Sequence, residues 1–172
     1  MSARRVIAWT MLALAVIALA VFGLSSKSSP PGGRRAPALP REQLVGTPTT
    51  LTGLIARAGG RPVAVLFWAS WCGPCNKEAP EIQRFAASAA GRGRIVGVDW
   101  SDSLGGARSF VRHYGWTFTN LRDAEGMVGN EYSMTDLPTT FVVNGHGRIA
   151  AELRGPQTQT SLREALTKAT AG

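Results

Sequence analysis

The chain has 172 residues, 44% of them hydrophobic, which is enough for one ordinary domain with a hydrophobic core and a tail. The formal net charge is +8, but residues 1–40 hold five basic and no acidic residues, whereas residues 41–172 hold 14 basic and 11 acidic residues. Most of the positive excess therefore lies near the N-terminus, and residues 41–172 contain no run of Lys or Arg that could follow a phosphate backbone. This charge distribution argues against nucleic acid as a partner.

The N-terminal segment has the pattern of a membrane anchor. Arg4 and Arg5 precede 19 residues without a charge, Val6 to Leu24, and a helix of this length would span about 28 Å, close to the hydrocarbon core of a bilayer. The two arginines favour a cytoplasmic N-terminus. The alternative is a signal peptide cleaved near residues 23–25, which would release a secreted form, but such peptides usually have a shorter apolar region. We therefore favour a single-pass anchor over residues 1–24.

Residues 25–40 separate this anchor from the rest of the chain. They contain four prolines and two glycines without apolar periodicity, which predicts a flexible linker. Residues 41–172 are then expected to form one folded domain on the far side of the membrane.

From residue 41 onward, short apolar segments alternate with segments of helical periodicity. The expected strands lie near 63–68, 95–98, 118–121, 139–143 and 148–153, and the expected helices near 75–90, 107–114, 126–132 and from 161 onward. Asn144 to Gly147 suits a hairpin between the last two strands, and Ser161 with Glu164 matches a capping box. This order predicts an α/β fold in which helices flank a central mixed sheet.

The chain has only two cysteines, Cys72 and Cys75, and they lie where the first apolar strand turns into a helix. Unpaired N–H groups and the positive end of the dipole at a helix start stabilise an anion, so Cys72 is the expected nucleophilic thiolate. Cys75, one turn further along the helix, would resolve the mixed disulfide. Gly73 and Pro74 keep the two sulfur atoms close, and Pro74 suits the first helical turn.

Three other roles fit the cysteine pair less well. A structural disulfide would close so short a loop that it removes little entropy from the unfolded chain. A zinc site needs four ligands, and His113 and His146 are far from the spacing of metal-binding motifs. A chance pair remains open, although it does not account for the strand-to-helix position. We therefore expect redox chemistry by the cysteines alone, with no cofactor and no metal ion.

Four motifs occur in a characteristic order: Phe67-Trp-Ala-Ser-Trp-Cys-Gly-Pro-Cys75, Glu78-Ala-Pro80, Leu137-Pro-Thr-Thr-Phe141 and Asn144-Gly-His-Gly-Arg-Ile149. They resemble the TlpA-like branch of the thioredoxin superfamily, which includes membrane-anchored thiol-disulfide reductases of cytochrome c maturation. The resemblance covers roughly residues 41–170 and implies a thioredoxin-like fold. Residues 97–102 and 110–115 are similar to the cytochrome c maturation thioredoxins in particular.

The resemblance also implies a substrate-binding region. Pro138 matches a proline that is expected to be cis and to lie beside the cysteines. The backbone of Leu137 would then pair with a substrate segment, and Trp71, Gly73 and Pro74 would complete the binding surface.

Glu78 matches an acidic residue that TlpA-like reductases place near the cysteines, where it could relay a proton to or from Cys75. Leu66 stands where thioredoxins carry a buried Asp, so Glu78 or water must handle this proton. The alternative for Glu78 is a solvated residue in the first turns of its helix. Trp68 and Trp71 are expected to pack beside the site as a lid over the sulfur atoms, with direct substrate stacking as the alternative.

The predicted function is that of an extracytoplasmic thiol-disulfide oxidoreductase that reduces protein disulfides, with apocytochrome c or a cytochrome-assembly partner as its substrate class. An oxidising compartment would require an upstream membrane electron donor. The alternatives are a disulfide-introducing oxidase and, in a different class, a copper-binding assembly factor. A peroxidase is disfavoured because Ala69 stands where peroxiredoxins carry Thr or Ser.

Overall fold

The computed structural model describes residues 33–170. The strands are β1 (Glu42–Val45), β2 (Val63–Trp68), β3 (Ile95–Trp100), β4 (Asn120–Asp123), β5 (Thr139–Val143) and β6 (Ile149–Arg154), and the helices are α2 (Leu51–Arg57), α3 (Gly73–Ala87), α4 (Leu104–His113), α5 (Met127–Glu131) and α6 (Gln159–Lys168). In this part of the chain, no helix has the length and apolar character needed to span a membrane. The anchor predicted over residues 1–24 lies outside the described residues.

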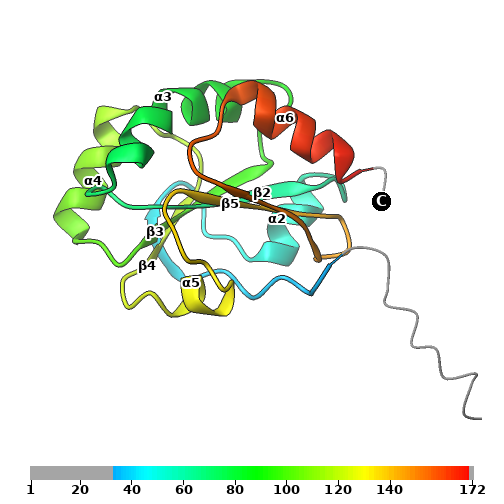
Figure 1. Cartoon of the computed structure of the whole chain (residues 1–172), viewed down its shortest axis with the longest axis horizontal. Helices are drawn as coiled ribbons and strands as arrows, with labels where there is room; N and C mark the ends of the chain where they lie inside the picture. Colours follow the sequence, from blue (N-terminus) through cyan, green and yellow to red (C-terminus); the bar gives the residue numbers. More distant parts are fainter. Residues whose placement is uncertain (1–32, 171–172) are drawn as a thin grey trace, which may run out of the picture. The chain divides into compact units, whose positions relative to one another are not determined.

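The strands form one mixed sheet in the order β1-β4-β3-β2-β5-β6 (Figure 1). The central strands β2, β3 and β4 run parallel, and α3 and α4 are the crossovers that connect them. At one edge, β5 and β6 continue the sheet antiparallel, and at the other edge β1 pairs antiparallel with β4. The sheet and its helices are the α/β arrangement that the sequence predicted.

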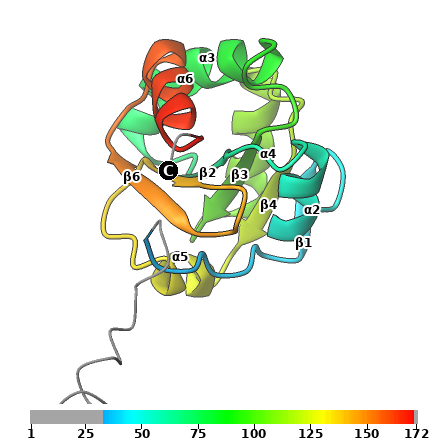
Figure 2. The same ribbon diagram turned by 90° about the vertical axis from the view of Figure 1, so that its right-hand side faces the viewer.

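Helices cover both faces of the sheet, and each face has its own hydrophobic core. In β2, Leu66 and Trp68 belong to the core under α3, α4 and α6, whereas Val65 and Phe67 belong to the core shared with α2. Figures 1 and 2 show α3 and α6 above the sheet and α5 below it. Burial of each such side chain contributes about 1.5–3 kcal/mol to the stability of the fold, so the strand that leads into the cysteines is firmly held.

Helix α3 positions the cysteine pair. Cys72 is its N-cap, and Pro74 lies in the first turn, where the missing N–H costs no helical hydrogen bond. Pro80 lies inside the helix, where a proline removes one hydrogen bond and favours a bend. The helix ends at Ala87 rather than near residue 90, because Ser88 adopts an extended conformation with φ −72° and ψ 160°.

Several element boundaries differ from the sequence-based expectations. The strand β1 and the helix α2 were not predicted, since β1 is an edge strand of four residues with no buried position. The capping box of α6 is formed by Thr158 and Ser161, so the helix starts earlier than a box at Ser161 and Glu164 would place it. The Thr158 hydroxyl accepts a hydrogen bond from the Ser161 N–H, and the Ser161 hydroxyl accepts one from the Thr158 N–H. These two bonds make Thr158 the N-cap of the helix.

Part of the segment assigned to the linker is packed against the domain. Ala36 and Leu39 are buried in the core that contains α2, and the hydroxyl of Tyr132 donates a hydrogen bond to the Pro37 carbonyl at 2.9 Å. The folded unit therefore begins before residue 41.

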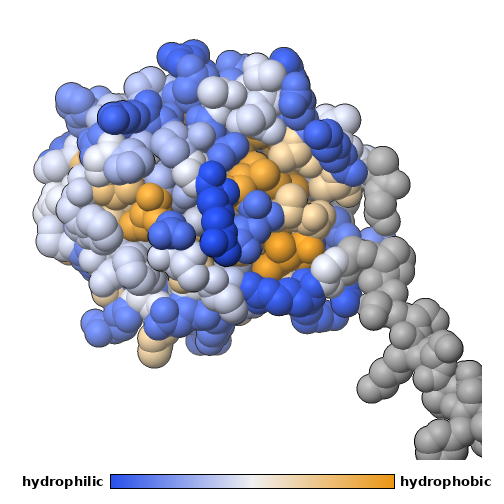
Figure 3. All heavy atoms as spheres, viewed as in Figure 1, coloured by the Kyte–Doolittle hydropathy of each residue, from blue (hydrophilic) through white to orange (hydrophobic). Residues whose placement is uncertain are grey.

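On the face seen in Figure 3, apolar surface occurs only as patches among hydrophilic side chains.

Candidate active site

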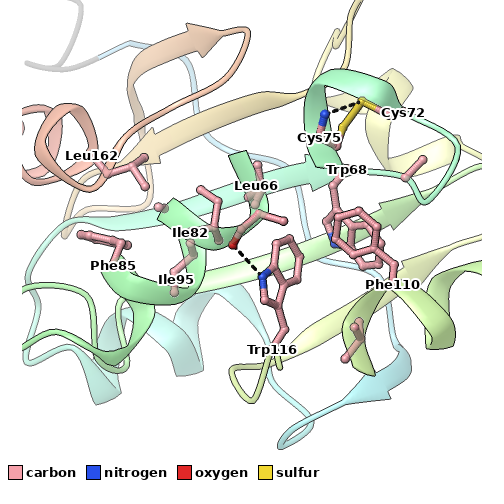
Figure 4. Close-up of a cluster of buried hydrophobic side chains, with 14 of the residues drawn as sticks. Leu66, Trp68, Cys72, Cys75, Ile82, Phe85, Ile95, Phe110, Trp116 and Leu162 are labelled. Carbon is pink, nitrogen blue, oxygen red and sulfur yellow. Dashed lines mark hydrogen bonds between the residues drawn. A yellow bond between two sulfur atoms is a disulfide. The ribbon is translucent and has the colours of Figure 1, made fainter. Parts of the chain in front are cut away.

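Cys72 and Cys75 form a disulfide at the start of α3, with their Cα atoms 5.2 Å apart (Figure 4). The Cys75 N–H donates a hydrogen bond to Cys72 Sγ at 3.1 Å. Both residues are buried, but a cleft at the surface is lined by Cys72 and not by Cys75. The same N–H and the helix dipole would stabilise negative charge on Cys72 Sγ after reduction, as the predicted role of Cys72 as nucleophile requires.

The cleft beside the disulfide has a volume of about 350 Å³. It is lined by Trp71, Cys72, Gly73, Pro74, Trp100, Met134, Thr135, Asp136 and Leu137. The peptide bond between Leu137 and Pro138 is cis, and Pro138 is buried next to the cleft residue Leu137. The structure thus brings together segments that are more than 60 residues apart in the sequence, and these segments contain all five residues predicted to bind substrate.

The two tryptophans of the motif have different positions. Trp71 is 59% exposed at the border of the cleft, and its indole N–H donates to the Ser101 carbonyl at 3.2 Å. Trp68 is fully buried, stacks on Phe110 with ring centroids 4.5 Å apart, and donates from its indole to Asn120 Oδ1 at 3.0 Å. Trp68 is therefore a core residue and not part of a lid over the sulfur atoms.

Four residues of the cleft were missed by sequence reasoning: Trp100, Met134, Thr135 and Asp136. The ring of Trp100 lies 6.4 Å from that of Trp71, which extends the aromatic border of the cleft. Trp100 belongs to the segment 97–102 that resembles cytochrome c maturation thioredoxins, so this motif was an available signal. Met134 and Asp136 carry no signal beyond their closeness to Pro138 in the sequence.

The loop that carries Cys72 is also held from α3 and α4. The side-chain amide of Asn76 donates to the carbonyls of Ser70 and Cys72 at 3.2 and 2.8 Å. The hydroxyl of Tyr114 donates to Asn76 Oδ1 at 3.0 Å. These contacts fix the backbone immediately before the nucleophile candidate, and a rigid backbone reduces the cost of orienting a reacting sulfur atom.

Glu78 is buried on α3 and is only 2% exposed, which rules out the solvated alternative. Its Oε2 accepts a hydrogen bond from the Gln157 N–H at 2.7 Å, and Oε1 has no hydrogen-bond partner among the described residues. Burial raises the pKa of Glu78 to about 8, although the Gln157 N–H acts in the opposite direction. A carboxyl group with this pKa can take up and release a proton near neutral pH, as a relay requires.

The loop that contacts Glu78 also contacts the cis-proline. Gly155 N–H donates to the Pro138 carbonyl at 2.9 Å, and the Gln157 side chain donates to the Gly155 carbonyl at 2.8 Å. Residues 155–157 therefore connect the predicted proton relay with the predicted substrate-binding segment. Sequence reasoning missed this loop because it has no chemical motif.

The cleft beside the disulfide is not lined by Leu66, His113 or His146. Leu66, which replaces the thioredoxin Asp, is fully buried in the core under α3, so no acid lies at that position. His113 is exposed at the end of α4, and His146 is exposed in the β5–β6 turn. Across residues 33–170, no group of three or more His, Cys, Asp or Glu side chains is arranged to hold a metal ion.

Comparisons with known proteins agree on one kind of protein. Residues 33–152 match the AhpC/TSA family. The chain is 33% identical over 141 residues to the thiol:disulfide interchange protein HelX of Rhodobacter capsulatus, which covers 81% of this chain and 77% of HelX. It is also 34% identical over 140 residues to the soluble secreted antigen MPT53 of Mycobacterium tuberculosis, covering 80% of this chain and 76% of MPT53.

The fold is likewise similar to solved structures. A putative thiol:disulfide interchange protein DsbE from Chlorobium tepidum superposes with a TM-score of 0.66 and is 26% identical in sequence. The superposition covers 80% of this chain and 96% of the DsbE chain. The thioredoxin-like architecture predicted from the motifs is therefore confirmed for the described residues.

Proposed function

The chain belongs to the AhpC/TSA family and is a thiol-disulfide oxidoreductase with a thioredoxin-like fold, and we propose that it reduces disulfides of protein substrates outside the cytoplasm. The observation that carries this proposal is the Cys72–Cys75 disulfide at the start of α3, beside a cleft that ends at the cis peptide bond of Leu137–Pro138. A peroxidase role is not proposed, because Ala69 lacks the hydroxyl that peroxiredoxins place at this position.

The reaction uses both sulfur atoms in turn. The Cys72 thiolate attacks one sulfur of a substrate disulfide, so a bond forms between the two sulfur atoms and the second substrate sulfur leaves as a thiolate. Cys75 then loses its proton and attacks Cys72 Sγ, which restores the disulfide of the structure and releases the first substrate sulfur. Two electrons pass to the substrate, and Glu78 in its ionised form accepts the proton from Cys75. An upstream electron donor in the membrane must then reduce the protein again.

The cleft is the proposed substrate-binding region. An extended substrate segment would lie along Leu137 and Pro138 and pair with the backbone of Leu137, in the way that a peptide adds to an exposed extended segment. Trp71, Gly73 and Pro74 would border the substrate disulfide on the side of the nucleophile. The candidate substrates are apocytochrome c and cytochrome-assembly partners, which the resemblance of segments 97–102 and 110–115 supports.

The direction of electron flow is tested by trapping the thiols in cells. Acid quenching followed by alkylation will find the Cys72–Cys75 pair mostly reduced if an electron donor keeps the protein active as a reductase. The measurement is the mass shift of the alkylated protein on a gel or by mass spectrometry. A pair found mostly oxidised would overturn the reductase proposal and support the disulfide-introducing oxidase instead.

The location is tested by fractionation of the full chain. The uncharged run of residues 6–24 predicts that the protein sediments with membranes and that protease added from the extracytoplasmic side digests its domain. N-terminal sequencing of the mature protein provides the second measurement. A soluble product that starts near residue 21 or 26 would show a cleaved signal peptide instead of the anchor.

A further inference from the structure

A cluster of charged side chains lies behind the loop that carries Cys72. Asp99, on β3, is fully buried, and its carboxyl group interacts electrostatically with that of Asp102 in the loop between β3 and α4. Arg122 on β4 donates from Nε to Asp99 Oδ2 at 3.3 Å and from Nη2 to the Asp102 carbonyl at 3.0 Å. Asp99 Oδ1 is buried and has no hydrogen-bond partner among the described residues.

The Asp102 carboxyl group accepts more hydrogen bonds than that of Asp99. Asp102 Oδ2 accepts from the Ser70 N–H at 2.6 Å, and Oδ1 accepts from the Ser70 hydroxyl at 3.0 Å and from the Ser103 N–H at 2.6 Å. These hydrogen bonds hold the Asp102 carboxyl group in place beside Ser70. Two adjacent carboxylates repel each other, the more so because Asp99 is fully buried, and a proton on Asp99 Oδ1 would remove the repulsion and satisfy the unpartnered oxygen.

We propose that Asp99 and Asp102 share one proton, and that this proton controls the reactivity of Cys72 through the contacts of Asp102 with Ser70. Ser70 lies two residues before Cys72, and Trp71, between them, donates to the Ser101 carbonyl next to Asp102. Asp102 is thus a positioning residue for the loop, and Asp99 determines the charge behind it. The inference rests on the proposed role of Cys72 as nucleophile.

The surrounding charges support a proton on Asp99 near neutral pH. Burial and then the negative charge of Asp102 raise the pKa of Asp99 to about 7, although Arg122 opposes the shift. Arg122 also pairs with Glu42 of β1 at 3.0 Å, so its single positive charge serves more than one carboxylate. When Asp99 loses its proton, the negative charge added beside Asp102 disfavours a further negative charge on Cys72, which lies on the loop that Asp102 holds through Ser70.

The test compares the parent protein with Asp99→Asn, whose amide can donate to Asp102 at every pH and so imitates the protonated state. We measure the rate of Cys72 alkylation by iodoacetamide in the reduced full chain from about pH 5 to about pH 8. The ratio of the variant rate to the parent rate is expected to be near one at the acidic end and to rise about threefold or more at the alkaline end. A ratio that does not change with pH overturns the proposal.

The matched control is Asp123→Asn. Asp123 is another buried carboxylate, which accepts hydrogen bonds from the N–H groups of Val128 and Gly129 and has no contact with Asp102 among those the structure shows. Its rate ratio to the parent is expected to be independent of pH. A pH-dependent ratio equal to that of Asp99→Asn would also overturn the proposal, because the effect would then not be specific to the Asp99–Asp102 pair.

A second measurement decides the question if Asp99→Asn does not fold. In the oxidised parent chain with ¹³C-labelled aspartate, one carboxyl carbon is expected to titrate near pH 7, well above the ordinary range for Asp. Titration of every aspartate at or below about pH 5 overturns the shared proton. This readout does not involve the cysteines, so its failure is distinct from a failure of the proposed function, which mixed-disulfide trapping through Cys72 tests separately.

Discussion

Replacement of Cys72 by serine will abolish disulfide exchange, whereas Cys75→Ser will leave a protein that forms mixed disulfides and cannot resolve them. Cys72 is the N-cap of α3 and lines the cleft, and Cys75 lies inside the first turn and does not line it. The rate of insulin reduction is expected to fall by about 10³-fold or more in Cys72→Ser, because serine is not a nucleophile toward disulfides under these conditions. The mixed disulfides are measured as reducible adducts on non-reducing gels.

The two variants are matched controls for each other, since each leaves one cysteine in an otherwise unchanged chain. Cys72→Ser is expected to trap almost no partner, although Cys75 remains present. Equal trapping by the two variants would show that the nucleophile has been assigned to the wrong sulfur atom.

Glu78→Gln is expected to slow the step in which Cys75 resolves the mixed disulfide, by about 10²-fold at most. The amide has the shape of the carboxyl group and can still accept the hydrogen bond from Gln157, but it cannot take up the proton of Cys75. The pH profile of the resolution step should therefore lose the ionisation near pH 8 that belongs to Glu78. Stopped-flow fluorescence of single-turnover exchange measures the rate.

Glu81→Gln is the matched control for this kinetic effect. Glu81 lies on the same helix and accepts a hydrogen bond from the Gln159 N–H at 3.1 Å, as Glu78 does from Gln157. However, hydrogen bonds from Gln159 and Arg84 lower the pKa of Glu81, so it stays ionised where Glu78 is protonated. Glu81→Gln should keep the parental rate and profile, and an unchanged profile in Glu78→Gln would refute the relay.

The same substitution of Glu78 will change how stability depends on pH. The pKa of Glu78 is about 8 in the folded protein and 4.5 as its ordinary value, so the folded state binds the proton more tightly than the unfolded state. The free energy of unfolding therefore falls as pH rises from 4.5 to 8, by at most about 1.4 kcal/mol per pH unit. Glu78→Gln will lack this contribution and exceed the parent in stability at the alkaline end, which urea unfolding at several pH values measures.

The elements that surround the cysteines could be predicted from the sequence because their signals are local. The continuous apolar run of β2 and the apolar face of α3 are properties of neighbouring residues, and so is the position of Cys72 between them. Edge elements were less predictable. The strand β1 is defined by its pairing with β4, nearly 80 residues away, and not by any pattern of its own.

The sequence by itself therefore determined the fold class, the redox pair and the candidate acid Glu78, because each depends on residues within a few positions of one another. Only the tertiary structure decided that Glu78 is buried under the loop at Gln157, which changes its proton affinity, and that Asp99 lies against Asp102 and Arg122. Burial and electrostatic interactions depend on which distant segments the fold brings together. For that reason the chemistry of these carboxyl groups could be read only after the sheet and its helices were in place.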